Sequence, residues 1–279
     1  MNHQKVLIRS QFKEIYVVIL LLIAFVPVLI WMSDRWFAED SYYSHGILVP
    51  IVSFLLVFRK KKALERILPE PSPWGLRVFL LGIILYWASA LWHVYFTSGF
   101  SLLIIIAGLV LHFHGERTLR EIAFPLSFLV FMVPLPIIVV ASVCFKLKIL
   151  AAYLATFILN LIGYPCVQLS SLIKMRHSYV LIEDSCGGLR SLISLTALGS
   201  LFAYQLRSGL RNKLVLFISA IPIAVIINSF RIVFLAIVGE TWGTDYTQGT
   251  LHSFSGSLVF AFAFLIMLAL KKILERRNG

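Results

Sequence analysis

Three residues of this chain have the side chains that acyl transfer needs: Cys186, Arg231 and His252. A thiolate is a nucleophile, an imidazole accepts and returns a proton near neutral pH, and a guanidinium can hold a developing oxyanion. Cys186 stands in 183–191, where a polar segment turns into an apolar run. A helix N-terminus behind this cysteine would favour its thiolate form. The three residues can act together only if they reach the same side of one membrane.

Each of the three also has a plainer explanation. An arginine inside an apolar run costs at least a few kcal/mol to insert, so it is expected to be functional or paired, for example with Glu183 or Asp184. A histidine before a helix can serve as a cap, and a free cysteine can pack as a small hydrophobic residue. Two further cysteines, Cys144 and Cys166, are expected to be buried and inert.

The composition identifies the class of protein. Of 279 residues, 59% are hydrophobic and 14% are charged, and the mean hydropathy is +0.91. Repeated long apolar runs of this kind require lipid as their solvent, so we predict an all-helical polytopic membrane protein. The net charge of +12 is carried by basic residues in short loops, which is typical of topology signals beside anionic lipid and argues against nucleic acid as a partner. The cysteines lack metal-ligand spacing, and neither a metal nor an organic cofactor is expected.

The positive-inside rule predicts eight transmembrane helices with both termini in the cytoplasm. The strongest inward marker is the basic run 59–62, and the N-terminus and C-terminus are also basic. The predicted spans are 15–32, 42–58, 78–96, 99–113, 122–133, 189–204, 214–238 and 256–270. Residues 97 and 98 form the expected outer turn of the second helical hairpin.

The segment 137–163 is ambiguous in this scheme. Counting it as a crossing would reverse the orientation of everything after it, against the charge rule. Its polar residues recur near helical period, so we interpret it as an amphipathic helix lying in the outer interface. Segments 167–173 and 178–182 favour strands and predict a small outer β-hairpin around residues 174–176. No internal repeat is evident, and 1–279 is predicted to be a single integral-membrane domain.

On this topology Cys186, Arg231 and His252 all converge on the outer leaflet. Arg231 lies roughly 10 Å below the outer end of its span at 1.5 Å per residue. A cysteine and histidine pair with a nearby arginine is then a plausible acyl transfer site.

At these residues the chain resembles the exosortase family, which consists of membrane cysteine transpeptidases related to archaeosortases. The resemblance covers most of the chain and lies in the order and spacing of short motifs. They are Tyr42-Tyr43-Ser44-His45-Gly46, Pro50, Pro134-Leu135-Pro136, Gly163-Tyr164-Pro165, the Cys186 segment, Asn228-Ser229-Phe230-Arg231-Ile232, and His252 with Gly256. One departure is Gly187, where the family more often has serine.

The resemblance implies a catalytic triad of Cys186, Arg231 and His252. It implies that exported proteins are cleaved at a C-terminal sorting signal, a Pro-Glu-Pro-type motif followed by a transmembrane helix and a basic tail. The site would face the periplasm from a bacterial inner membrane. Arg190, Asn228 and His45 stand in or beside the family's motifs and are candidates for substrate binding. Neither the acceptor nucleophile nor the oligomeric state follows from the sequence, and neither does the choice between His252 and Arg231 as the group that takes the thiol proton.

Two other functions use the same residues differently. A transporter could bind an anion through Arg231, Arg190 and the outer histidines, with Cys186 incidental. A membrane acyltransferase could use the same thiol chemistry on a lipid substrate.

Overall fold

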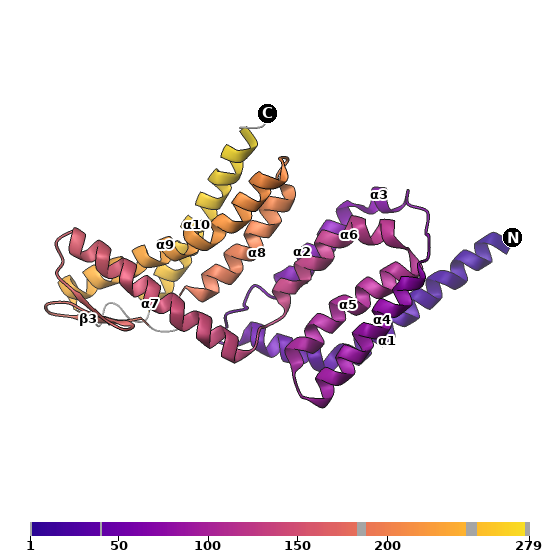
Figure 1. The fold of residues 1–279 in the computed structure, drawn as a ribbon, viewed down its shortest axis with the longest axis horizontal. Coiled ribbons are helices and arrows are strands. Elements are labelled where there is room, and N and C mark those ends of the chain that lie inside the picture. The colour runs from indigo at the N-terminus through magenta and orange to yellow at the C-terminus, as the bar shows by residue number, and fades with distance from the viewer. Residues whose placement is uncertain (1, 40, 183–187, 244–249, 277–279) are drawn as a thin grey trace. The chain divides into compact units, whose positions relative to one another are not determined.

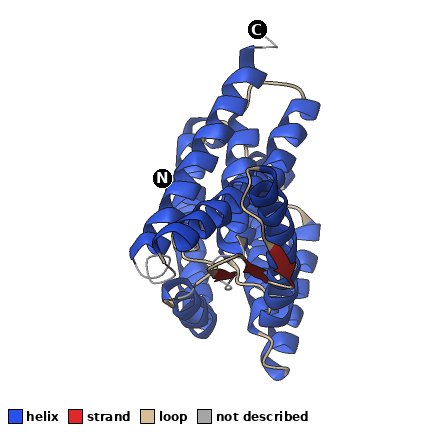
Figure 2. Ribbon diagram, turned by 90° about the vertical axis from the view of Figure 1, so that its left-hand side faces the viewer, coloured by secondary structure: helices blue, strands red, loops and turns tan. Residues whose placement is uncertain are grey.

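A computed structural model describes residues 2–39, 41–182, 188–243 and 250–276, without the side chains of 2–14 and 250–253. In these residues the chain is mostly helical and carries one small sheet (Figures 1 and 2). The helices are α1 (Asn2–Phe37), α2 (Leu48–Arg59), α3 (Lys61–Leu64), α4 (Pro73–Leu91), α5 (Tyr95–Phe113), α6 (Glu116–Phe128), the 3-10 helix η1 (Leu129–Met132), α7 (Ile137–Leu161), α8 (Leu189–Gln205), α9 (Leu210–Trp242) and α10 (Thr250–Arg276). The strands are β1 (Val167–Leu169), β2 (Leu172–Lys174) and β3 (Tyr179–Leu181).

Six described helices are long and apolar enough to cross a membrane. The six segments are Ile15–Phe37, Pro73–Leu91, Tyr95–Phe113, Ile137–Leu161, Leu210–Trp242 and Phe254–Arg276. Helix α7, expected in the interface, is among them, whereas α2, α6 and α8 are not. Helices α2 and α8 have only 12 and 17 residues, because a polar turn precedes α2 and Gly188 caps α8. Helix α6 carries charged residues in its first turns and passes into η1 before Pro134.

Contacts divide the chain into two compact units, which we describe separately. The first contains residues 1–39 and 44–134, and its centre is the antiparallel pair α4 and α5. Glycines on both helices permit close backbone approach, as in many membrane helix pairs. A side chain at Gly75 would collide with the backbone of His112, and one at Gly108 would collide with that of Phe79.

The outer turn of this helix pair differs from the prediction. The helices are joined by residues 92–94, so Thr97 and Ser98 lie inside the first turn of α5. The hydroxyl groups of Ser89, Thr97 and Ser98 form a hydrogen-bonded cluster that closes the turn. The polar residues Thr97 and Ser98 are typical of a turn. Here their hydroxyl groups form hydrogen bonds with Ser89, so they are accommodated inside the helix.

The second unit contains residues 40–43 and 135–279 and carries α7, the sheet, α8, α9 and α10. Helix α9 packs against both α8 and α10 around a buried core. This core includes Leu195, Leu216, Ala220, Ala263 and Met267. Helix α7 contacts α9 and runs crosswise to the three helices in Figure 1.

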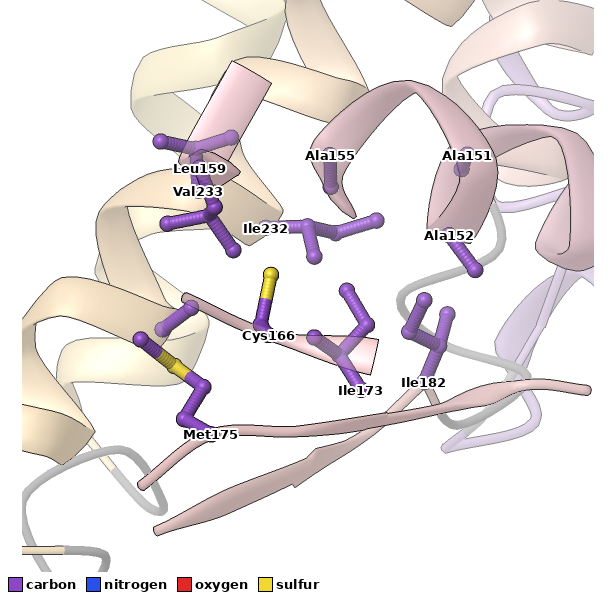
Figure 3. Close-up of a cluster of buried hydrophobic side chains, with 11 residues drawn as sticks. Ala151, Ala152, Ala155, Leu159, Cys166, Ile173, Met175, Ile182, Ile232 and Val233 are labelled. Atoms are coloured by element: carbon purple, nitrogen blue, oxygen red, sulfur yellow. The ribbon is translucent and has the colours of Figure 1, made fainter. Parts of the chain in front are cut away.

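The sheet is a three-stranded antiparallel meander, in the order β1-β2-β3. The predicted single hairpin was therefore wrong in strand number: 167–173 is itself two strands joined at Ser170, which has a positive φ of 58°. One sheet face packs on α7 and α9. Figure 3 shows Ile173 and Ile182 pointing toward Ala152 and Ile232, in a cluster that also contains Cys166 and Met175.

Candidate functional site

Arg231 is the centre of the candidate site. It lies on α9 with only 8% of its surface exposed. Its Nε donates a hydrogen bond to the hydroxyl of Ser255 on α10 at 3.0 Å, and Ser255 is itself buried. Because the bond is made by Nε, which lies in the plane of the guanidinium next to the aliphatic chain, it restricts rotation of that plane. The arginine is thus a buried cation held in a defined orientation.

The start of α10 brings a second close contact to the same guanidinium. A side chain at Gly256 would come within 3.4 Å of a terminal nitrogen of Arg231. Positions 255 and 256 therefore both adjoin Arg231. The backbone position of His252 lies one helical turn before them, at spacings of three and four residues that share one helix face. The side chain of His252 lies outside the described residues.

The start of α8 meets α9 one turn from Arg231. Gly188, the N-terminal cap of α8, has φ +77, and a side chain there would come within 2.9 Å of the Asn228 amide nitrogen. Asn228 is buried and lies three residues before Arg231, so both residues share a face of α9. A narrow crevice opens beside this contact and includes Ala151 and Leu147 of α7 in its lining. Cys186 lies outside the described residues, two positions before Gly188.

Helix lengths give the depth of the site. At about 1.5 Å per residue, Arg231 is roughly 30 Å along α9 from Leu210. The opposite ends of α8 and α10 meet where the Lys271 ammonium donates to Gln205 at 3.3 Å. The distance from Gln205 to Gly188 along α8 is about 25 Å, and the distance from Lys271 to Ser255 along α10 is similar. A bilayer hydrocarbon core is about 30 Å thick, so a bundle spanning it has this site near one boundary.

Of the other predicted binding residues, Arg190 is half-buried in the first turn of α8. His45 belongs to the first unit, in the loop before α2, where it forms a hydrogen bond with the backbone of Phe131. Burial lowers the pKa of His45 from 6.5 to about 4, against the smaller opposing effect of that bond.

The neighbours of His45 are also tightly fitted. A side chain at Gly46 would collide with the Trp36 indole, whose N–H donates to the Met132 carbonyl at 2.9 Å. In the second unit, the Leu135 N–H donates to the Tyr43 hydroxyl at 3.1 Å. The Tyr-Tyr-Ser-His-Gly motif therefore has a structural explanation: Tyr43 bonds the backbone after Pro134, and His45 bonds the backbone before it.

The expected burial of Cys144 and Cys166 is confirmed. Burial raises the pKa of the Cys166 thiol, which disfavours the reactive thiolate. The Asn160 side-chain amide donates a hydrogen bond to the Cys166 carbonyl and accepts one from the Cys166 N–H, both at 3.1 Å. These two thiols are core residues and are not suited to act as nucleophiles. In the described part of the chain, no three His, Cys, Asp or Glu side chains gather as metal ligands.

Two residues of the site were missed by sequence reasoning. Ser255 is one turn after His252, and Gly188 follows two residues after Cys186. Each could have been suspected from that spacing, but a serine and a glycine in apolar surroundings carry no signal of their own.

An apolar groove lies elsewhere, between α1 and α5 of the first unit. Its lining is almost entirely aliphatic and aromatic, with Phe25, Leu102 and Ile106 among its residues. Its one polar lining residue is His114 at the groove's end, and the groove offers a surface for lipid chains.

These observations define a polytopic helical membrane protein with a buried arginine on α9, close to the first turns of α8 and α10. The sequence model of the family described as transmembrane exosortase matches residues 31–269. The chain belongs to the transmembrane exosortase family. Comparison with curated proteins and with solved structures gives no match.

Proposed function

We propose that this protein is a membrane cysteine endopeptidase and transpeptidase that removes the C-terminal sorting signal of exported proteins. The observation that carries the proposal is Arg231, a buried guanidinium held by Ser255 one turn from the Gly188–Asn228 contact. Two residues of chain reach at most about 7 Å, which keeps a nucleophile at position 186 near this point. Family membership supports the same chemistry.

The proposed reaction is acyl transfer through a thioester. The Cys186 thiolate adds to the scissile carbonyl carbon, and Arg231 stabilises the negative charge on the carbonyl oxygen. His252, carrying the thiol proton, donates it to the departing amine as the peptide bond breaks. An acceptor amine, hydroxyl or water then attacks the thioester and gives its proton to His252, while the Cys186 thiolate leaves. Arg190, Asn228 and His45 are proposed to help bind the substrate.

The proposed topology has eight spans, with α7 in the outer interface and both termini in the cytoplasm. It is supported by the basic loops and by the crosswise course of α7 over the α8–α10 bundle (Figure 1). The protein would lie in a bacterial inner membrane with its site facing the periplasm. The substrate's own transmembrane helix would enter beside the bundle and hold the scissile peptide at the depth of Arg231.

The decisive experiment is coexpression with an exported protein that ends in a Pro-Glu-Pro-type motif, a transmembrane helix and a basic tail. Immunoblotting should show a shortened product with the wild-type enzyme. With Cys186→Ala the full-length precursor should persist in the membrane, because no thioester can form. Cys186→Ser should be nearly inactive, since a hydroxyl has a far higher pKa than a thiol.

Cys166→Ala is the matched control, because it removes a buried thiol from the same unit and should leave processing intact. Wild-type processing by Cys186→Ala would exclude a thiol enzyme and favour an anion transporter. Unprocessed protein substrates together with Cys186-dependent acylation of lipid would favour the acyltransferase.

A further inference from the structure

We propose that the outer face of the small sheet is a membrane-docking surface that lies among the lipid headgroups of the outer leaflet. This inference does not depend on the proposed reaction. It begins with the register, which aligns Val167 with Lys174 and Tyr179 across the three strands. The next row on the same face aligns Leu169, Leu172 and Leu181. The opposite face supplies Ile173, which is fully buried.

Apart from Lys174, the side chains of the outer face are apolar or aromatic although the face is exposed. Val167, Leu169, Tyr179 and Leu181 are each more than half exposed. A sheet with one face in water normally alternates apolar and polar residues, so a sheet that is mostly apolar on both faces indicates a second apolar environment.

The charge of the sheet region indicates which environment this is. Residues 163–182 contain Lys174 and Arg176 but no aspartate or glutamate. Both basic residues are exposed. A surface of aliphatic residues with a tyrosine and basic side chains is the pattern found at the interface between lipid and water, where anionic headgroups attract lysine and arginine.

The attachment of the sheet sets its height. Its inner residues pack against Ile232, Val233 and Ala236 of α9, immediately beyond Arg231. Glu240 accepts hydrogen bonds from the His177 N–H at 3.0 Å and the Ser178 hydroxyl at 2.6 Å, which ties down the β2–β3 turn. Along α9, Ile232 and Ala236 lie about 2 and 8 Å beyond Arg231, and Glu240 lies about 13 Å beyond it. Because Arg231 is near the hydrocarbon boundary, the side of the sheet that packs on Ile232 and Ala236 lies at the level of the headgroup layer, which extends roughly 5–8 Å beyond the core. The β2–β3 turn, tied to Glu240, lies on the water side of that layer.

Spin labels test this proposal in the full-length protein reconstituted without substrate into vesicles of phosphatidylcholine and phosphatidylglycerol. Cys144 and Cys166 are buried, so Cys186→Ala gives a suitable background. Labels at Leu169→Cys and Leu181→Cys report on the sheet. Collision with oxygen, which dissolves in lipid, is compared with collision with a water-soluble nickel chelate.

Two further positions calibrate the measurement: Phe262→Cys, exposed on the middle of α10, and Arg207→Cys, exposed after α8. Both sheet positions should show an oxygen-to-nickel ratio several-fold above that of Arg207→Cys and below that of Phe262→Cys. A ratio equal to that of Arg207→Cys at both sheet positions would mean that the face is in water and would overturn the proposal. Low collision rates with both reagents would mean that protein covers the face, and would also overturn it.

The charge contribution is tested separately. In the spin-labelled Leu181→Cys protein, the double substitution Lys174→Glu and Arg176→Glu should lower the oxygen-to-nickel collision ratio in vesicles that contain phosphatidylglycerol. The same change should have little effect in vesicles of phosphatidylcholine alone. Equal effects in both vesicles would contradict the recognition of anionic lipid.

Discussion

Arg231 and Ser255 form the best-defined polar contact of the candidate site. The two terminal nitrogens of Arg231 would lie 3.4 and 3.8 Å from a Cβ added at Gly256. A hydrogen bond to a charged group contributes about 1.5–3 kcal/mol, so losing it should disturb the orientation of the guanidinium without removing its charge. Ser255 is therefore a positioning residue, whereas Arg231 is proposed to act on the reacting atoms.

Substitutions at Arg231 and Ser255 should slow substrate processing by different factors. Arg231→Lys keeps the charge but loses the planar fork, and processing should slow by roughly 10²- to 10³-fold. Ser255→Ala should lower kcat by about tenfold with little change in KM, and Ser255→Thr should restore most of it. The measurement is steady-state cleavage of a purified substrate over a range of substrate concentrations.

Ser257→Ala is the control for Ser255→Ala, because it changes the same residue type on an exposed side of α10. If Ser255→Ala and Ser257→Ala have the same kcat, Ser255 does not position the arginine.

The lowered pKa of His45 predicts that the free energy of unfolding depends on pH. Its pKa of about 4 in the folded protein lies below the ordinary 6.5, so the unfolded chain takes up the proton first as pH falls. The stability contributed by neutral His45 is complete above about pH 6.5 and is lost as pH falls toward 4. The loss is at most about 3 kcal/mol. Thermal unfolding in detergent between about pH 4 and 7 should show it.

His45→Asn should flatten this acid limb, because asparagine does not titrate. An acid limb of equal slope in wild type and His45→Asn would show that other groups cause it.

At the scale of elements, the junction between α8 and α9 depends on the absence of a side chain at Gly188. Gly188→Ala should be destabilising for two reasons: the left-handed φ costs about 1–2 kcal/mol, and the new methyl group would press on Asn228. Gly163 separates these effects, because it has φ +90 and a Cβ added there would meet nothing within 4 Å. Gly163→Ala should therefore cost only the backbone strain.

Thermal unfolding in detergent should give a lower midpoint for Gly188→Ala than for Gly163→Ala. Adding Asn228→Ala to Gly188→Ala should recover part of the difference. Equal midpoints for the two alanine variants would mean that the α8 cap is not packed against Asn228.

At the scale of the whole molecule, the prediction is the orientation of the chain. Single cysteines at Lys174 and Asp245 should react with a membrane-impermeant maleimide in intact cells with a permeable outer membrane. Cysteines at Lys61, Arg117 and Arg211 should react only after the inner membrane is opened.

The outer turn of α4 and α5 needs a different probe from the one that the sequence suggests. Thr97 is half-buried and hydrogen-bonded, so exposed His93 is the better position for a cysteine. Labelling at 174 only after the inner membrane is opened would contradict the outer position of the sheet and of α7.

Much of the architecture could be predicted from local sequence. Long apolar runs require helices in lipid, and prolines and charged turns end them, so the helices and the Pro134 break fall close to the predicted positions. The small strands were predicted in the right region because 167–173 and 178–182 are rich in residues that favour strands. Their number was wrong because the Ser170 turn depends on a positive φ at a residue type that gives little warning of it.

The sequence by itself determined that this is a membrane protein of this family, and it singled out Cys186, Arg231 and His252 as candidates. Only the tertiary structure decided that Arg231 is buried against Ser255 and that Gly188 packs on Asn228. The physical reason is that helix formation depends on neighbours along the chain, whereas partners on different helices depend on how those helices are rotated and how closely they approach. Residues 231 and 255 are 24 positions apart, and no local pattern specifies which faces of α9 and α10 meet.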